Sequence, residues 1–245
     1  MSGLITALRL LSIFPVPGRD AEEMSSALPW FPLTGAILGG VLYGLALLAD
    51  GWSGGGWPNG VAAAVLLGGV VITGALHLDG LADWADSFGG KNKQAALAIM
   101  KDSRTGAFGV IALVLVLLVK WVSLVRLIES DAFVWIVVAY IVSRTMQVEL
   151  AVSLPYARAE GGTGASIVQG ARRSHRIWAL ISALIMLVVL GGQAGVLALG
   201  AGWAVCRGFG WWCRRRLGGM TGDLLGAGSE IVETLILVIF AGAGR

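Results

Sequence analysis

Three aspartates stand at helical spacing in the segment 77–87, where their carboxylates could bind a metal ion. Asp79, Asp83 and Asp86 occupy positions i, i+4 and i+7, so a helix places them on one face. Because like charges at this spacing repel, a hard divalent cation would stabilise them, and oxygen ligands select Mg²⁺, Mn²⁺ or Ca²⁺ over zinc. The alternative is a solvated acidic face, but the segment directly follows an apolar run, where ionisable residues are costly and usually functional. We therefore predict that the three aspartates are metal ligands.

His77 opens the same segment, two residues before Asp79. Its imidazole could act as a general base, as a hydrogen-bond partner that orients another group, or only as a residue at the end of a helix. The residues alone leave these three roles open.

A cationic motif precedes the next apolar run. Lys101 and Arg104 supply positively charged donors, and Gly106 and Gly109 leave backbone N–H groups accessible at a helix start. These groups together suit a phosphate. The alternative is that the two cations only anchor the helix at the membrane surface.

Further polar groups lie in the second half of the chain. Arg144 falls inside the apolar run 132–154, so it either pairs with a carboxylate or contacts a substrate phosphate. The glycine-rich segment 155–164 could wrap a ligand, although it lacks the spacing of a phosphate-binding loop. Asp223, Glu230 and Glu233 again share roughly one helix face. Two acidic faces with cations nearby indicate a metal-assisted phosphate site rather than an ion pathway.

The elements that must position these residues are membrane helices. Of the 245 residues 56% are hydrophobic and only 13% are charged, and the mean hydropathy is +0.80. A soluble domain carries about 25% charged residues. Seven apolar runs approach bilayer-spanning length, namely 33–49, 60–76, 107–128, 132–154, 177–191, 194–210 and 224–243. We predict an all-α, polytopic membrane protein of about seven spans, forming one domain over residues 1–245, with the fifth and sixth spans joined as a tight hairpin or a broken helix.

The connecting segments alternate in charge. Lys and Arg gather in the N-terminal segment, in 91–104, in 158–176 and in 207–216, whereas the segments around Asp50, 129–131 and 191–193 hold almost none. Basic short loops stay in the cytoplasm, so seven spans with a cytoplasmic N-terminus reproduce the alternation and place the polar site on the cytoplasmic side. The net charge of +3 has the same origin, so we do not expect nucleic-acid binding.

Smaller features fit the same interpretation. Residues 1–17 lack a basic start and a cleavage site, so we expect an interfacial helix rather than a signal peptide. Cys206 and Cys213 are too far apart on one helix for a disulfide and are expected to be buried thiols. The pairs Gly35–Gly39 and Gly40–Gly44 predict close helix packing.

With these motifs in order, the chain resembles the cobalamin synthase family, the adenosylcobinamide-GDP ribazoletransferases. The residues that carry the resemblance are 14–17 (FPVP), 31–35 (FPLTG), 77–83 (HLDGLAD) with Asp86, 99–104 (IMKDSR) with 106–109 (GAFG), 155–158 (PYAR), and 221–223 (TGD) with Gly226, Ala227 and Glu233. They span nearly the whole chain. Trp84 and Gly89–Gly90 are mild departures from the family pattern.

The resemblance implies that the enzyme joins adenosylcobinamide-GDP to α-ribazole, or to its 5′-phosphate, with release of GMP and a requirement for Mg²⁺. It also implies a multi-pass protein of a bacterial or archaeal cytoplasmic membrane. Mg²⁺ would be held by Asp79, Asp83 and Asp86, with Asp102 or Asp223 completing its ligands, while Lys101 and Arg104 grip the transferred phosphate. A carboxylate or His77 would take the hydroxyl proton. The other expected substrate-binding residues are Arg144, Arg158 and Glu233.

The sequence also leaves two other functions open as alternatives. A CDP-alcohol-type phosphotransferase of phospholipid synthesis uses similar chemistry but releases CMP. A cation transporter would use the acidic face as an ion path, but transporters place such charges near the bilayer midplane and often contain inverted repeats, and here the aspartates follow the end of a span. The expected partners are therefore small-molecule substrates and the lipid bilayer, with a second copy of the chain, in a homo-oligomer, as a further candidate.

Overall fold

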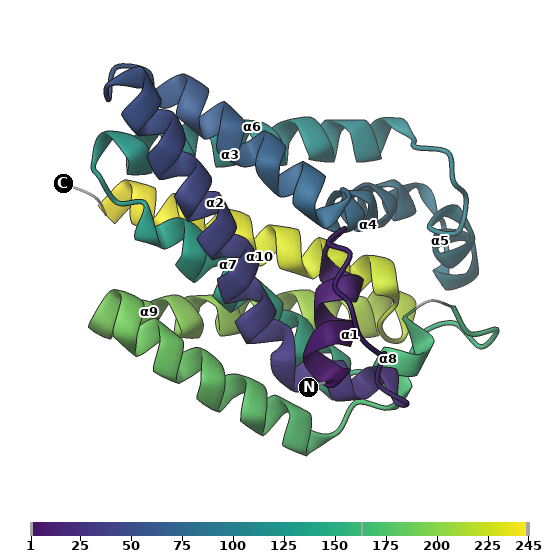
Figure 1. Ribbon diagram of the computed structural model, residues 1–245. Helices are drawn as coiled ribbons and strands as arrows, with labels where there is room; N and C mark the ends of the chain where they lie inside the picture. The colour runs from purple at the N-terminus through teal and green to yellow at the C-terminus, as the bar shows by residue number, and fades with distance from the viewer. Residues whose placement is uncertain (1, 163, 244–245) are drawn as a thin grey trace.

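The chain is helical throughout in a computed structural model, which describes residues 2–162 and 164–243 (Figure 1). The elements in order are α1 (Ser2–Leu11), η1 (Met24–Trp30), α2 (Phe31–Ser53), α3 (Pro58–Thr73), α4 (Leu76–Asp86), η2 (Ser87–Gly89), α5 (Lys93–Ile99), α6 (Ala107–Glu129), α7 (Val134–Ser153), α8 (Ala165–Gln169), α9 (Arg173–Leu217) and α10 (Gly222–Ala243). Within the described residues no strand forms, and Tyr156 and Met220 make an isolated bridge between two loops. The predicted all-α class is confirmed.

Five helices are long and apolar enough to cross a membrane, and the bent pair of α3 and α4 makes a sixth if it is one span. The five are α2 with η1, α6, α7, α9 and α10. The 45 residues of α9 are broken at Gly192, where φ is 54° and ψ is −134°, and Gly195 then packs on the backbone of Leu187. The expected hairpin or broken helix is therefore confirmed, whereas the count of seven spans remains a prediction.

The two ends of the bundle differ in what they carry (Figure 1). The connections on either side of α4 and α5, the segment around α8 and the turn before α10 lie at one end, to the right in the view. The bends after α2 and α6, and the break in α9, lie at the other end. The segments rich in Lys and Arg therefore share one end, as the charge alternation predicts.

Helices α2 and α7 form the central contact of the bundle, and glycines allow it. A Cβ at Gly35 would lie 2.6 Å from the carbonyl oxygen of Tyr140, and one at Gly39 would lie 2.8 Å from the Cα of Val137. The predicted close packing is thus correct for this pair of glycines. It is wrong for Gly40 and Gly44, since a Cβ built at either position would meet nothing within 4 Å among the described residues.

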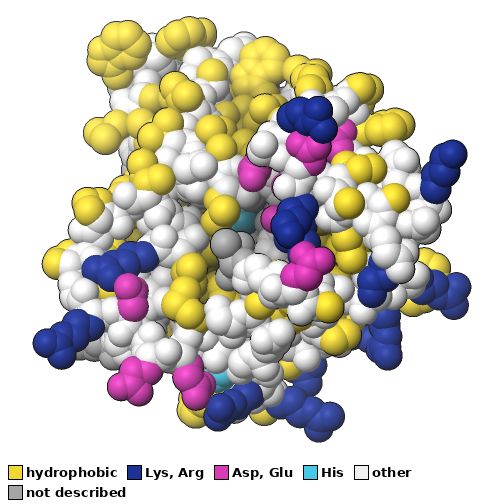
Figure 2. Space-filling model, turned by 90° about the vertical axis from the view of Figure 1, so that its right-hand side faces the viewer, with side chains coloured by type: hydrophobic (Ala, Val, Ile, Leu, Met, Phe, Trp, Pro, Cys, Tyr) yellow, Lys and Arg dark blue, Asp and Glu magenta, His cyan; other side chains and the backbone are white. Residues whose placement is uncertain are grey.

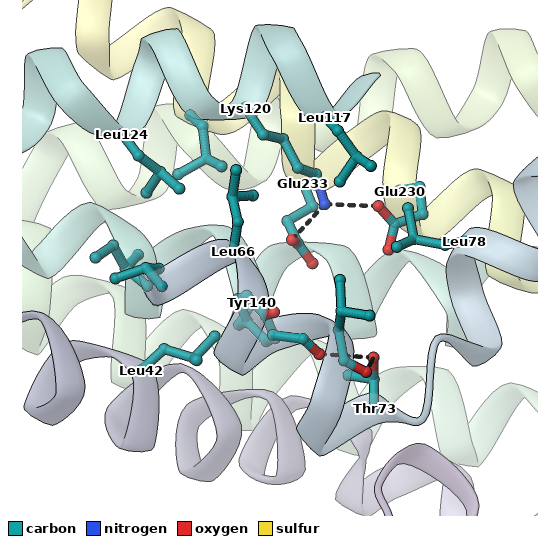
Figure 3. Close-up of a pocket in the computed structure, with 15 residues that line it drawn as sticks. Leu42, Leu66, Thr73, Leu78, Leu117, Lys120, Leu124, Tyr140, Glu230 and Glu233 are labelled. Carbon is teal, nitrogen blue, oxygen red and sulfur yellow. Dashed lines mark hydrogen bonds and ion pairs between the residues drawn. The ribbon is translucent and has the colours of Figure 1, made fainter. Parts of the chain in front are cut away.

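Four charged side chains join α6, α7 and α10 in the middle of the bundle. Lys120 Nζ lies 2.6 Å from a carboxylate oxygen of Glu230 and 2.6 Å from one of Glu233 (Figure 3). Arg144 donates to Glu233 over 3.3 Å and to Ser229 over 2.5 Å, and its guanidinium lies 4.9 Å from the ring centre of Tyr140. All four are buried, and their formal charges cancel. We name Lys120, Arg144, Glu230 and Glu233 the buried quartet.

The quartet generates a prediction about stability. Lys120→Met leaves two buried carboxylates facing one guanidinium, and removal of one partner from a buried ion pair costs about 3–5 kcal/mol. Thermal unfolding in detergent, followed by circular dichroism, should show a clearly lowered midpoint. Adding Glu230→Gln restores neutrality and should recover part of the loss. The exposed Lys91→Met is the control, and a Lys120→Met variant as stable as this control would contradict the prediction.

Candidate active site

A sharp bend places the acidic helix at the end of the bundle. Gly74 and Ala75 both adopt left-handed backbone conformations, each with φ of 58°, and α4 turns by 89° from α3. We therefore treat α3 as membrane-spanning and α4, which runs across the end of the bundle, as outside the spanning segments. The sequence predicted this polar segment directly after the apolar run, and the structure adds the turn.

Two glycines bring α4 against the start of α10. A Cβ at Gly80 would lie 2.5 Å from the backbone oxygen of Asp223, and one at Gly226 would lie 3.2 Å from the Cα of His77. Asp223, in the first turn of α10, is thereby held beside the helix face that carries Asp79 and Asp83. Of the second predicted acidic face, Asp223 thus meets Asp79 and Asp83, whereas Glu230 and Glu233 belong to the buried quartet. We name Asp79, Asp83 and Asp223 the acidic cluster.

The negative charge of the acidic cluster exceeds the positive charge of the residues around it. The pKa of Asp83 is raised to about 7, first by its partial burial and then by the carboxylates of Asp79 and Asp223, while Arg158 acts in the opposite direction. A divalent cation would relieve this repulsion, and the donors are all carboxylate oxygens, which hard cations prefer. As they stand, no three His, Cys, Asp or Glu side chains in the described part of the chain are close enough to hold a metal ion.

Arg158 is the cation that reaches the acidic cluster. Its Nη2 donates to Asp223 Oδ2 over 2.8 Å and to the backbone oxygen of Met100 over 3.3 Å. The side chain is 17% exposed, so the pair is shielded but open to a ligand on one side. This one residue ties the segment after α7 to the connection between α5 and α6. Of the glycine-rich segment 155–164, residue 163 lies outside the described residues.

Asp86 has a different environment from the other two predicted ligands. Its carboxylate is buried and accepts hydrogen bonds from the backbone N–H groups of Gly106, at 2.6 Å, and Gly109, at 2.8 Å. These groups begin α6, so Asp86 caps that helix from α4, and the negative charge also suits the positive end of the helix dipole. The sequence predicted that these two N–H groups are accessible to a phosphate, which is wrong for this structure, because both already donate to Asp86.

Several predicted site residues lie apart from the acidic cluster. Lys101 pairs with Glu160 over 3.0 Å, and Arg104 pairs with Asp102 over 2.6 Å, with both cations strongly exposed. Hydrogen bonds from Arg104 hold the pKa of Asp102 down at about 2. Arg144 and Glu233 belong to the buried quartet. The sequence left two roles open for Arg144, and the structure shows the first of them, pairing with a carboxylate.

The sequence interpretation missed Lys120, which lies near the middle of the apolar run 107–128. A lysine at that depth needs a carboxylate partner, and Glu230 and Glu233 were visible in the last run. Those two signals could have predicted the pairing of α6 with α10.

A cavity of about 250 Å³ adjoins the acidic cluster, and its lining includes His77, Asp79 and Asp223. Figure 2 looks onto this end of the bundle, where histidine, acidic and basic side chains gather around a hollow in the surface. His77 itself is buried, and neither of its ring nitrogens has a hydrogen-bond partner among the described residues. The site therefore combines an excess of carboxylates, the guanidinium of Arg158 at the cluster, and a hollow, lined also by Arg9, that is large enough for part of a substrate.

Comparisons with known proteins give one consistent answer. The family model described as cobalamin-5-phosphate synthase matches residues 3–241. An adenosylcobinamide-GDP ribazoletransferase of Chlorobaculum parvum is 46% identical over 98% of this chain and 95% of its own length. The enzymes of the same name from Chlorobaculum tepidum and Syntrophobacter fumaroxidans are 47% and 42% identical, over 98% and 95% of this chain and 95% of their own lengths. No solved structure matches the chain significantly.

The two environments of the aspartates predict different effects of the same substitution. Asp86→Asn should lower stability by about 1–3 kcal/mol, because an amide cannot replace both charge-assisted acceptors at the start of α6. Asp79→Asn removes an exposed charge and should change stability by less than about 0.5 kcal/mol. Both are measured by thermal unfolding in detergent. Equal midpoints for the two variants would show that Asp86 does not cap α6.

Proposed function

We propose that this chain, which belongs to the cobalamin-5-phosphate synthase family, carries out its phosphoryl transfer at the acidic cluster with a bound divalent cation. The chain is an adenosylcobinamide-GDP ribazoletransferase, an enzyme of the final step in assembly of the cobalamin nucleotide loop. The phospholipid-synthase and transporter alternatives are set aside on this ground. The observation that carries the proposed site is the crowding of Asp79, Asp83 and Asp223 beside a single arginine.

The substrates we propose are adenosylcobinamide-GDP and α-ribazole or its 5′-phosphate. A ribose hydroxyl attacks the phosphorus atom attached to the cobinamide, the bond from that phosphorus to the bridging oxygen breaks, and GMP leaves with that oxygen. Asp79, Asp83 and Asp223 would hold Mg²⁺ once their side chains draw closer together around it, and the ion would then neutralise the diphosphate and stabilise charge on the departing GMP.

The chain's own residues supply the remaining functions in this proposal. Arg158 binds an oxygen of the transferred phosphate, because it is the guanidinium in contact with the cluster. Asp79 accepts the hydroxyl proton on the carboxylate oxygen that does not bind the cation, since it lines the cavity and makes no hydrogen bond or ion pair to another described side chain. Lys101 and Arg104, at the rim, remain predicted phosphate ligands, and their present partners Glu160 and Asp102 would have to release them.

Two arginine-to-lysine variants distinguish Arg158, which contacts the acidic cluster, from Arg104, which lies at the rim. Lysine lacks the planar fork that fits two phosphate oxygens, so Arg158→Lys should reduce kcat by about 30-fold, or about 2 kcal/mol, with a smaller effect on KM. Arg104→Lys tests the rim in the same way. Steady-state GMP release in detergent with Mg²⁺ is the measurement, and EDTA should abolish it. A fully active Arg158→Lys enzyme with an impaired Arg104→Lys enzyme would move the phosphate site to the rim.

The proposed cytoplasmic position of the site is tested by labelling. In a background of Cys206→Ala and Cys213→Ala, a membrane-impermeant maleimide added to intact cells should reach Asp50→Cys and Gly192→Cys. It should reach Ser174→Cys only after the cells are opened, because Ser174 follows the basic residues at the site's end of the bundle. Labelling of Ser174→Cys in intact cells would reverse the orientation.

A further inference from the structure

The cavity beside the acidic cluster is built from six helices at the end of the bundle, α1, α2, α4, α7, α8 and α10. Leu10 and Leu11 of α1, Phe31 of α2 and Ile167 of α8 provide apolar walls. Gln147 of α7 reaches the cavity from the core. The charged residues of the lining are Asp79 and Asp223 beside the cluster and Arg9 of α1, whose guanidinium is bound to Asp20 and to the backbone oxygens of Val16 and Gly18.

Two buried polar side chains in the lining have unused hydrogen-bonding atoms. Both ring nitrogens of His77 and the Oε1 atom of Gln147 have no partner among the described residues, although these side chains are only 2% and 3% exposed. The Nε2 atom of Gln147 makes a long contact of 3.4 Å with the backbone oxygen of Leu225. A buried donor or acceptor left unpaired is costly, so such atoms mark a place where a ligand or water completes the bonds.

The size of the cavity distinguishes between the two substrates. At about 250 Å³ it lies just below the usual range for small-molecule sites, about 300–1,000 Å³, and it has no room for a corrin ring. A flat bicyclic base fits the apolar walls. Apart from Arg9, which is paired with Asp20, and the carboxylates of Asp79 and Asp223, the lining offers two polar side chains, His77 and Gln147. Guanine would bring several donors and acceptors to these two side chains, whereas a benzimidazole-type base presents one free ring nitrogen.

We propose that this cavity, the acceptor cavity, binds the flat base of α-ribazole, with His77 donating to the free ring nitrogen and Gln147 Oε1 accepting from the nucleoside. The inference rests on the proposed function and identifies the acceptor side of that site. Asp79 and Asp223 line both the cavity and the cluster, so a base seated here holds its ribose beside the carboxylates. The corrinoid and GDP parts of the other substrate then approach from the open side, near Arg158.

A pair of tryptophan variants on α1 tests the cavity by binding rather than by turnover. Leu10→Trp fills the cavity, whereas Leu8→Trp adds the same side chain to the same helix at a position that does not line it. The purified full-length protein in nanodiscs is titrated calorimetrically with α-ribazole, and separately with GDP and Mg²⁺. Leu10→Trp should weaken α-ribazole binding by about tenfold or more and leave the Kd for GDP within about twofold. Leu8→Trp should change neither.

Two further variants separate this inference from the proposed cation site. Gln147→Leu keeps the size of the side chain and removes its amide, so it should weaken α-ribazole binding alone. Asp83→Asn should weaken Mg²⁺-dependent GDP binding and spare α-ribazole. If Asp83→Asn fails to affect GDP while Leu10→Trp affects α-ribazole, the cation proposal is wrong and the acceptor cavity stands.

The acceptor cavity is overturned by either of two results. Loss of GDP binding in Leu10→Trp, with α-ribazole unaffected, would assign the cavity to guanine. Unchanged binding of both ligands in a Leu10→Trp protein of normal thermal stability would mean that the cavity holds only water.

Discussion

The fold depends on the pairing of four charges in the middle of the bundle. Lys120, Arg144, Glu230 and Glu233 come from three different helices, and each would be expensive in hydrocarbon without the others. Their need for partners fixes the depth at which α6, α7 and α10 meet. The same helices carry the site at their ends, since α6 begins at the groups capped by Asp86 and α10 begins beside Asp223. The pairing of charges at the centre of the bundle therefore sets the positions of the helix ends that form the proposed site.

At the acidic cluster, in contrast to the buried quartet, the charges do not cancel. Three carboxylates face Arg158, and partial burial makes ionisation of Asp83 harder. Proteins seldom retain such repulsion without a cation or substrate that relieves it, which is why perturbed carboxylates in a hollow indicate function. The charges in the bundle core cancel and are buried, while the end that carries the acidic cluster is charged and open. This division separates what the chain uses for folding from what it uses for chemistry.

The sequence predicted the helices well and the partnerships between them poorly. Apolar runs located the long helices to within a few residues, and the spacing of Asp79 and Asp83 correctly predicted one face of α4. Spacing along one helix contains no information about groups on another. For that reason Asp86 was grouped with the ligands although it caps α6, Lys120 was missed, and Arg144 and Glu233 were assigned to substrate although they pair in the core. Asp223 was identified, but its place beside Gly80 depends on a helix crossing that only the structure contains.

The bend at Ala75 has a consequence for the order in which the protein is made. A left-handed alanine costs about 1–2 kcal/mol, so local preference does not hold α4 at its angle. Its packing against α10 does, through Gly80 and Gly226. Because a chain emerges from the ribosome N-terminus first, α4 cannot make this packing until α10 has been synthesised. The proposed site is therefore completed only when α10 is present, and a chain that stops before Gly222 has the aspartates of α4 but lacks Asp223.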